Sequence, residues 1–343
     1  MNRYLFFVTK PYSFAILEPL QNYIQTQSLG EVKWFLSSKA QLHPAPGEAL
    51  EDTKQVKDYQ PNAILVPGNI VPPWWPGLKV QVFHGLDDEV KGFYRINGLF
   101  DLYCTPGPTM SRRFTTLAER YGHFIVRETG WPKLDPLANP QNMHLMRREL
   151  GLDSERPVIL YAPTFPEKYT SAPDLRDPIR DLISTGEYTW LIKFHPLMDS
   201  EIVASYRELC SDSCEVVEDL NILPCLQAAD ILITDTSSVA YEFMLLDRPI
   251  ITYRATARLD KGIDIQSPSQ LADAIQQSLA HPNEFSPARQ SYLAEIHPYN
   301  DGESSRRVVA AIEVALKQNL VQHLRRKPLN LNRRVKIKRM LKP

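Results

Sequence analysis

Short apolar runs alternate with polar or amphipathic stretches along the first 130 residues. The runs are LFFV at residue 5, VKWFLS at 32, AILVPG at 63, VQVFHG at 80, LYCTPG at 102 and FIVRETG at 124. This rhythm is typical of a parallel β-sheet whose strands are joined by covering helices. The first half of the chain therefore predicts one α/β domain.

The same rhythm returns after residue 156. Strands are expected at VILYAPTF, YTWLIKFHP, CEVVED, ILITDTS and PIITY, with helices near 199–209, 222–229, 238–246 and 268–279. Between the halves, residues 139–156 hold a helix-like stretch and then polar DSERP. We expect an α/β fold of two Rossmann-like domains facing a cleft, with 1–150 as the first and 151–322 as the second. The helical pattern from Glu303 to Leu320 predicts a terminal helix crossing the hinge.

Length and composition agree with two globular domains. A chain of 343 residues exceeds one ordinary core at roughly 150 residues per domain. It is 43% hydrophobic and 23% charged. Its 28 prolines exceed the usual share of about 5%, which favours many short strand-loop-helix junctions.

Charge is distributed unevenly. The net charge is −1, but nine Lys or Arg lie between Arg325 and Lys342, and no acid follows Glu313. Apolar side chains are interleaved with these bases, and a tail of this kind over 323–343 suits an anionic membrane surface. A solvated basic end and a nucleic-acid contact are the alternatives. We expect the membrane surface and no nucleic acid.

Neither a signal peptide nor a membrane-spanning helix is expected. Tyr4 to Val8 is apolar, but Lys10 and Pro11 interrupt it. We therefore expect a cytoplasmic protein, peripheral at the inner face of the cell membrane. The four cysteines lack CxxC spacing, which favours buried free thiols over a metal site.

The stretch ILITDTSSVAYEFMLLDRPIITY, residues 231–253, is a candidate phosphate site. An apolar strand leads into Asp235, Thr236, Ser237 and Ser238, which are all residue types that cap helices, and a helix is expected next. Hydroxyls, backbone N–H groups and the helix dipole would favour a diphosphate there. Asp235 suits a cap better than an anion ligand, and an ordinary capped helix is the alternative.

Two histidines follow expected strands, His84 before Gly85 and His195 before Pro196. Ligands of open α/β sheets lie at the carboxyl ends of strands, so both positions are candidate catalytic sites. A histidine is a natural general base near neutral pH, and a second one can donate a hydrogen bond to a phosphoryl oxygen. His-Pro occurs four times in the chain, so a structural role is the alternative for His195.

Three further clusters carry weaker signals. The acids Asp87, Asp88 and Glu89 suit a divalent metal or, more simply, a solvated loop, so no metal ligand is assigned. Thr164 closes a strand and would face the ligand or form a local turn. The segment DGESSRR opens the terminal helix, and its Ser304, Ser305 and Arg306 would bind a phosphate or merely cap the helix.

Several of these stretches occur together in one known family. The HG pair, LYAPTF, KFHP, ADILITDTSSVAYEFMLLDRPIITY and DGESSRR, in this order and spacing, resemble the CDP-glycerol glycerophosphotransferase family, the teichoic acid primases and polymerases of GT-B fold. The resemblance is strong over about residues 155–310 and thinner before them. This chain reads FHGLDDEVK where family members usually read WHGTPLK.

The resemblance implies roles for individual residues. His84 matches the proposed base of the family and His195 a second required histidine. Ser237 and Ser238 would hold the diphosphate of a CDP-polyol in the C-terminal domain, with Asp301, Ser305 and Arg306 near the donor as weaker matches.

The function expected on these grounds is transfer of glycerol phosphate, or a related polyol phosphate, from a CDP-linked donor to a hydroxyl of a lipid-linked or cell-surface glycan, with release of CMP. One alternative is a sugar transferase of the same fold that uses a CMP- or UDP-sugar in surface polysaccharide synthesis. Another is a nucleotide- or nucleic-acid-binding module. The sequence leaves a need for a divalent metal undecided.

Overall fold

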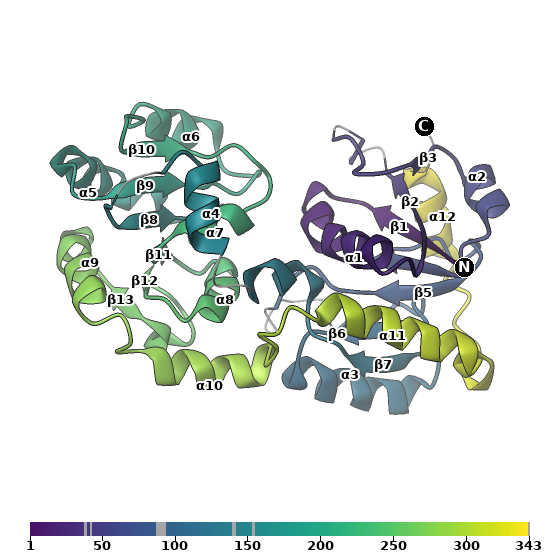
Figure 1. The fold of residues 1–343 in the computed structure, drawn as a ribbon. Coiled ribbons are helices and arrows are strands. Elements are labelled where there is room, and N and C mark those ends of the chain that lie inside the picture. The colour runs from purple at the N-terminus through teal and green to yellow at the C-terminus, as the bar shows by residue number, and fades with distance from the viewer. Residues whose placement is uncertain (38–39, 42, 87–93, 139–141, 153–154, 342–343) are drawn as a thin grey trace. The chain divides into compact units, whose positions relative to one another are not determined.

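The structure is a computed structural model that describes residues 1–37, 40–41, 43–86, 94–138, 142–152 and 155–341. The chain folds into two compact units (Figure 1). Unit 1 comprises Met1–Pro136 and Ala294–Pro343, and unit 2 comprises Leu137–Leu293.

Unit 1 contains a seven-stranded parallel sheet in the order β3-β2-β1-β4-β5-β6-β7. The central strands are apolar at every position because helices cover both faces of such a sheet. All four residues of β4 are buried, for example. The strands are β1 (Asn2–Val8), β2 (Gly30–Leu36), β3 (Ala49–Leu50), β4 (Ala63–Val66), β5 (Leu78–Gln81), β6 (Leu102–Thr105) and β7 (Ile125–Glu128).

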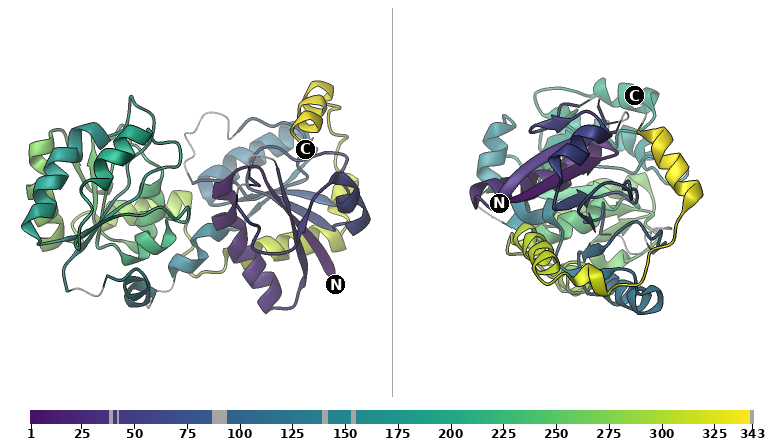
Figure 2. Two further views of the ribbon diagram at one scale, coloured as in Figure 1. Left: turned by 90° about the horizontal axis from the view of Figure 1, so that it is seen from above. Right: turned by 90° about the vertical axis from the view of Figure 1, so that its right-hand side faces the viewer.

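The helices of unit 1 come from both ends of the chain (Figure 2). The 3-10 turns η1 (Pro11–Ser13) and η6 (Leu320–His323) supplement them, while η2 (Pro132–Ala138) and α10 (Ser286–Ile296) span the divisions between the units. The α-helices are α1 (Phe14–Thr26), α2 (Thr53–Tyr59), α3 (Pro108–Tyr121), α11 (Ser304–Lys317) and α12 (Leu331–Met340).

Unit 2 repeats the plan with a six-stranded parallel sheet in the order β10-β9-β8-β11-β12-β13. Its strands are β8 (Val158–Tyr161), β9 (Thr189–Ile192), β10 (Cys214–Val216), β11 (Ile231–Thr234), β12 (Ile250–Tyr253) and β13 (Ile263–Ile265). Its helices are α4 (Asn142–Glu149), α5 (Ala172–Thr185), α6 (Ser200–Arg207), α7 (Leu223–Ala228), α8 (Val239–Phe243) and α9 (Leu271–Ala280), with 3-10 turns η3 (Met244–Leu246), η4 (Leu259–Lys261) and η5 (Pro268–Gln270).

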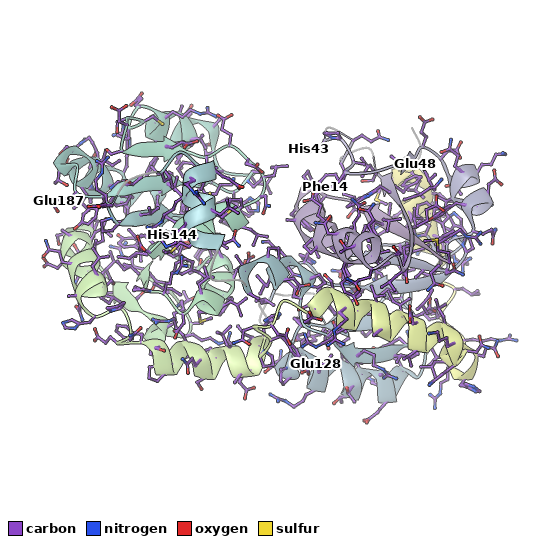
Figure 3. The ribbon with its side chains drawn as sticks, in the orientation of Figure 1. Phe14, His43, Glu48, Glu128, His144 and Glu187 are labelled. Carbon is purple, nitrogen blue, oxygen red and sulfur yellow. The ribbon has the colours of Figure 1, made fainter. Side chains whose placement is uncertain are left out.

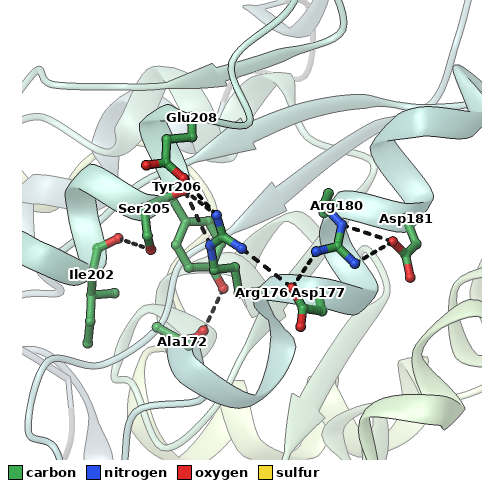
Figure 4. A network of polar contacts seen from close by, with 9 residues as sticks. All are labelled: Ala172, Arg176, Asp177, Arg180, Asp181, Ile202, Ser205, Tyr206 and Glu208. Carbon is green, nitrogen blue, oxygen red and sulfur yellow. Dashed lines mark hydrogen bonds and ion pairs between the residues drawn. The ribbon is translucent and has the colours of Figure 1, made fainter.

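Each unit has its own hydrophobic core. The core of unit 1 includes the fully buried Trp75 and Phe83, and that of unit 2 includes Tyr161 and Trp190. On the outside of unit 2 a polar network joins α5 to α6 (Figure 4), with Arg176 bonded to the carbonyl of Ser205 and to Glu208. Both sheets confirm the expected parallel α/β architecture.

The placement of residues 294–322 differs from the expected division. The sequence assigned them to the second domain, whereas α11 packs on α1, β5 and β6 of unit 1. Its buried side chains include Val308 and Ile312. Ahead of α11, the Tyr299 hydroxyl donates to Glu128 (2.8 Å), which Figure 3 labels. The units therefore divide at 136/137 and 293/294 rather than at residue 150, and a helix crossing the hinge stays a prediction.

The expected basic tail is also different from a free chain end. Residues 331–340 form α12, and Ile337 is 1% exposed within the core of unit 1. Lys327 pairs with Asp101 (2.5 Å), and Asn330 donates to the carbonyl of Asn97 (2.6 Å). Buried apolar and charged contacts of this kind hold the segment in place.

Two smaller expectations can be compared with the described part of the chain. None of its helices is long and apolar enough to cross a membrane. All four cysteines are free; Cys104, Cys214 and Cys225 are buried as expected, but Cys210 is exposed.

Candidate functional site

Both sheets reverse their strand order beside their first strand. In unit 1 the reversal lies between β1 and β4, and in unit 2 it lies between β8 and β11. A ligand of an open α/β sheet binds at such a switch point, outside the carboxyl ends of the strands. We call these places the first and second switch points and describe each within its own unit.

His84 lies at the first switch point. It follows β5 by three residues, its Nδ1 lies 3.3 Å from the carbonyl oxygen of Pro67 after β4, and its ring stacks on Tyr12 after β1. Because a carbonyl only accepts hydrogen bonds, Nδ1 carries the proton and Nε2 carries the lone pair. This is the tautomer that a base acting through Nε2 requires.

The burial of His84 favours its neutral form. Burial lowers the pKa of His84, and the hydrogen bond to Pro67 opposes this only in part. The preceding residue, Phe83, has φ +59°, a region that bulky side chains rarely adopt and that costs about 1–3 kcal/mol. Such local strain is frequent at functional sites. The acids Asp87, Asp88 and Glu89 lie outside the described residues.

Asp235 is the centre of the second switch point. Its carboxylate accepts from the backbone N–H of Thr164 (2.9 Å), which follows β8, and from both the N–H and the hydroxyl of Ser171 (2.9 Å each). The side chain is 1% exposed, and burial raises the pKa of Asp235 against the effect of these bonds. Asp235 therefore braces the loops after β8 and β11, as a cap would, and Ser171 is a partner that the sequence did not reveal.

The hydroxyl turn follows Asp235. Thr236 and Ser237 are half-buried and Ser238 is exposed. Ser237 Oγ is 3.5 Å from the N–H of Val239, and Ser238 makes no side-chain capping bond to α8. The expected helix over 238–246 is shorter, because α8 ends at Phe243 and continues only as a 3-10 turn. Hydroxyls and backbone N–H groups, rather than a long helix dipole, would then attract an anion.

His195 lies three residues beyond β9 in unit 2. Its Nδ1 accepts a hydrogen bond from the backbone N–H of Leu197 (3.1 Å), so Nε2 carries the proton. The ring stacks on Phe165 with centroids 4.4 Å apart. Partial burial and the nearby charge of Lys193 lower the pKa of His195. His195 is exposed, and its Nε2–H can act as a hydrogen-bond donor.

Lys193 is a candidate that the sequence reading missed. It is 7% exposed, its ammonium donates to the carbonyl of Phe194 (3.1 Å), and burial lowers its pKa. A buried lysine beside a strand-end histidine adds positive potential where a phosphoryl group would lie. The available signal was a lysine inside an otherwise apolar strand end, LIKFHP.

The start of α11 is already occupied within unit 1. The backbone N–H groups of Ser304 and Ser305 donate to the two carboxylate oxygens of Asp135 (2.9 and 2.7 Å). Arg306 pairs with Glu303, and Asp301 pairs with Arg307. The amide groups that a phosphate would use are thus bonded to a carboxylate, so the role expected for Asp301, Ser305 and Arg306 near a donor remains a prediction without support from these contacts.

Metal ligands do not gather in the part of the chain that the structure describes, where no group of three His, Cys, Asp or Glu side chains is placed to hold an ion. The described residues thus offer neutral histidines, hydroxyls and backbone N–H groups. Two Rossmann-like units carrying such groups at their switch points define a protein class whose sites suit a phosphate-bearing, nucleotide-type ligand.

Comparison with known proteins identifies the family of the chain. The chain belongs to the CDP-glycerol:poly(glycerophosphate) glycerophosphotransferase family, whose model matches residues 84–314. The match begins at His84 and includes His195 and the hydroxyl turn.

Curated relatives carry related names. The teichoic acid glycerol-phosphate primase of Bacillus spizizenii is 31% identical over 170 residues, which are 48% of this chain and 43% of that protein. The primase of Bacillus subtilis is 29% identical over 199 residues, 52% of this chain and 51% of that protein. The chain thus spans about half the length of the curated relatives it matches.

Solved structures share the fold. The wall teichoic acid polymerase TagF has a TM-score of 0.70 at 18% identity, covering 93% of this chain and 90% of that chain. The UDP-GlcNAc 2-epimerase of Neisseria meningitidis, bound to UDP-GlcNAc, has a TM-score of 0.64 at 14% identity, covering 91% of this chain and 100% of that chain. The comparison supports the two-domain Rossmann-like architecture.

Proposed function

We propose that this protein transfers glycerol phosphate, or a related polyol phosphate, from a CDP-linked donor to a hydroxyl of a lipid-linked or cell-surface glycan. The observation that carries the proposal is a pair of strand-end histidines, inside the region matched by the family, whose Nδ1 atoms face opposite partners: a carbonyl at His84 and an N–H at His195. One histidine can accept a proton and the other can donate a hydrogen bond.

In the proposed reaction the acceptor oxygen attacks the β-phosphorus of the CDP-polyol. Nε2 of His84 takes the acceptor proton, a new phosphorus–oxygen bond forms, and the bond to the CMP oxygen breaks. Nε2–H of His195 and the hydroxyls of Ser237 and Ser238 meet the charge on the phosphoryl oxygens, which is the main requirement in phosphoryl transfer. Asp235 holds the turn, together with Thr164, through contacts already described.

A donor screen tests the donor class. Thermal unfolding is followed with CDP-glycerol, CDP-ribitol, CMP, UDP-GlcNAc and a CMP-sugar, on wild type and Ser238→Ala. A donor at 100 times its dissociation constant adds about 2.7 kcal/mol of stability. We expect a CDP-polyol to stabilise the wild type and to do so less in Ser238→Ala. Stabilisation by a nucleotide sugar alone would contradict the proposal and favour a sugar transferase.

We also propose that the protein acts at the inner face of the cell membrane. The basic segment 325–341 supports this, because Leu329, Leu331 and Val335 are exposed between its lysines and arginines. Each basic residue near an anionic surface contributes about 1 kcal/mol. Co-sedimentation with vesicles containing phosphatidylglycerol should exceed that with neutral vesicles and fall in high salt; equal binding to both would contradict this.

A further inference from the structure

A groove in unit 1 lies between α12 and two loops near the carboxyl edge of the sheet. Arg333, Lys336 and Met340 line it from α12, and Asn69 and Arg95 line it from the loops. Residues 333, 336, 337 and 340 share one face of the helix, because they are three, four and seven positions apart. The volume of the groove is about 1010 Å³, which is large enough for an extended ligand.

The charge of this groove has one sign. Arg95, Arg333 and Lys336 line it, whereas none of its lining residues in the described ranges is acidic. None of the three has a carboxylate within 4.0 Å among the residues that the structure covers. Lys327, on the same C-terminal segment, is by contrast paired with Asp101. Cations that line one space attract an anion of more than one charge.

The groove continues the first switch point. Asn69 follows β4 by three residues, and Pro67, two residues earlier, binds His84. The Asn69 side chain accepts from Gln81 at the end of β5 (2.5 Å), and its carbonyl accepts from the Asn97 amide (2.7 Å). These bonds connect the wall of the groove to the end of β5, which leads into His84, and to the loop after β4, which contacts His84.

Apolar side chains also line the groove. Ile70, Leu331 and Met340 contribute hydrocarbon surface next to the three cations. A free inorganic anion would contact only the cations. An amphiphile joins an anionic group to a hydrocarbon chain, so it would contact the cations and the apolar side chains together.

We propose that this groove binds the diphosphate and adjoining hydrocarbon of a lipid-linked acceptor, so that the acceptor's hydroxyl-bearing glycan extends toward His84. The inference rests on the proposed function and names the place of its acceptor. It assigns Arg95, Arg333 and Lys336 to the diphosphate.

Binding of farnesyl diphosphate to the full chain, measured by titration calorimetry, tests the inference without turnover. The test variant is Arg333→Ala/Lys336→Ala. The matched control is Lys338→Ala/Arg339→Ala, which removes the same charge from the same helix outside the groove lining. We expect a loss of about tenfold or more in the test variant and less than about twofold in the control, because only the test variant removes charged hydrogen-bond donors to the diphosphate.

Two additional probes separate the sources of binding. Inorganic diphosphate should bind more weakly than farnesyl diphosphate, since it lacks the hydrocarbon. Vesicles containing phosphatidylglycerol should lose binding equally in the two variants. Equal loss of farnesyl diphosphate in both variants, or vesicle loss confined to the test variant, would overturn the inference. Unchanged melting temperatures confirm that both variants fold.

The failure of this inference is distinguishable from failure of the proposed function. CDP-glycerol should stabilise Arg333→Ala/Lys336→Ala as much as wild type, because the proposed donor groups lie in unit 2. A protein that binds CDP-glycerol but not farnesyl diphosphate keeps its function and loses this acceptor groove. A protein that binds only farnesyl diphosphate loses the donor assignment.

Discussion

The two strand-end histidines follow strands on opposite sides of the reversals in their sheets, and their rings make opposite hydrogen bonds at Nδ1. His84 donates through Nδ1 to the carbonyl of Pro67, whereas His195 accepts at Nδ1 from the N–H of Leu197. Nε2 is therefore an acceptor in unit 1 and a donor in unit 2. One backbone contact for each ring decides this difference.

The contrast shows that two similar sheets can give a histidine different hydrogen-bond partners. Both sheets place a histidine beyond the carboxyl end of a strand, but the backbone partner of the ring comes from a different place in each unit. Around His84 that partner comes from a neighbouring strand end. Around His195 it comes two residues later in the same loop, so the local sequence KFHPL suffices.

The largest expected effect comes from removing the proposed base. His84→Ala should lower the rate of CMP release from CDP-glycerol by about 10²- to 10⁴-fold, because general base catalysis contributes that much. Stabilisation by CDP-glycerol should stay near that of wild type. His84→Gln should be as inactive, since an amide cannot accept the proton. Substantial activity in either variant would contradict the assigned role.

Substitution of His195 in unit 2 should lower the rate of CMP release less than substitution of His84. His195→Ala should lower CMP release by about 10²- to 10³-fold, the usual cost of one lost donor to a phosphoryl or oxyanion oxygen. His195→Gln retains an N–H donor and should recover part of the rate. A partial rate of CMP release in His195→Gln, together with none in His84→Gln, would support a donor role for His195 and a base role for His84. Equal rates in the two variants would contradict these different roles.

Much of the fold could be predicted from the sequence because its signals are local. Runs such as AILV and ILIT indicate buried parallel strands, and the strand-end position alone selects His84 and His195. The sequence predicted that Asp235 acts as a cap rather than as an anion ligand, which agrees with its bracing contacts. Its partner Ser171 was not predicted, because the contact joins residues 64 positions apart and no periodicity encodes it.

The C-terminal segment shows why other parts could not be predicted. The sequence pattern predicted the helix α11. It could not predict which sheet the helix covers, because an apolar stripe packs equally well on either core. In α12 only Ile337 is buried, and one apolar anchor among basic residues gives no periodic signal. The groove beside α12 was therefore beyond reach of the sequence as well.

A substitution of Asp235 measures how much its carboxylate contributes to the stability of the loops at the second switch point. Asp235→Asn should lower the free energy of unfolding by about 2–4 kcal/mol, because an amide cannot accept from all three donors and a buried N–H is left unpaired. Urea unfolding measures this. Asp212→Asn, at an exposed position of unit 2, is the control and should stay within about 0.5 kcal/mol. Equal effects would deny Asp235 its bracing role.

The pH dependence sharpens the assignment of the base. Burial lowers the pKa of His84 below its ordinary 6.5, and the base works only when neutral. Activity should therefore be lost as the pH falls through a value below 6.5, and the acidic limb of kcat/KM should lie there. The pKa of His195 is lowered as well. If the limb belongs to His84, it persists in His195→Gln; its disappearance there would assign it to His195.

The smallest effect is expected in the exposed charge network on α5 of unit 2. Arg180 bonds to Asp177 (2.7 Å) and Asp181 (2.9 Å) in the network of Figure 4, and all three side chains are at least half exposed. Such pairs contribute about 0–1 kcal/mol because water and salt screen them. Arg180→Ala should therefore change the free energy of unfolding by less than about 1 kcal/mol and leave CMP release unchanged. A large loss of activity would mean that the chemistry of unit 2 extends beyond its strand ends.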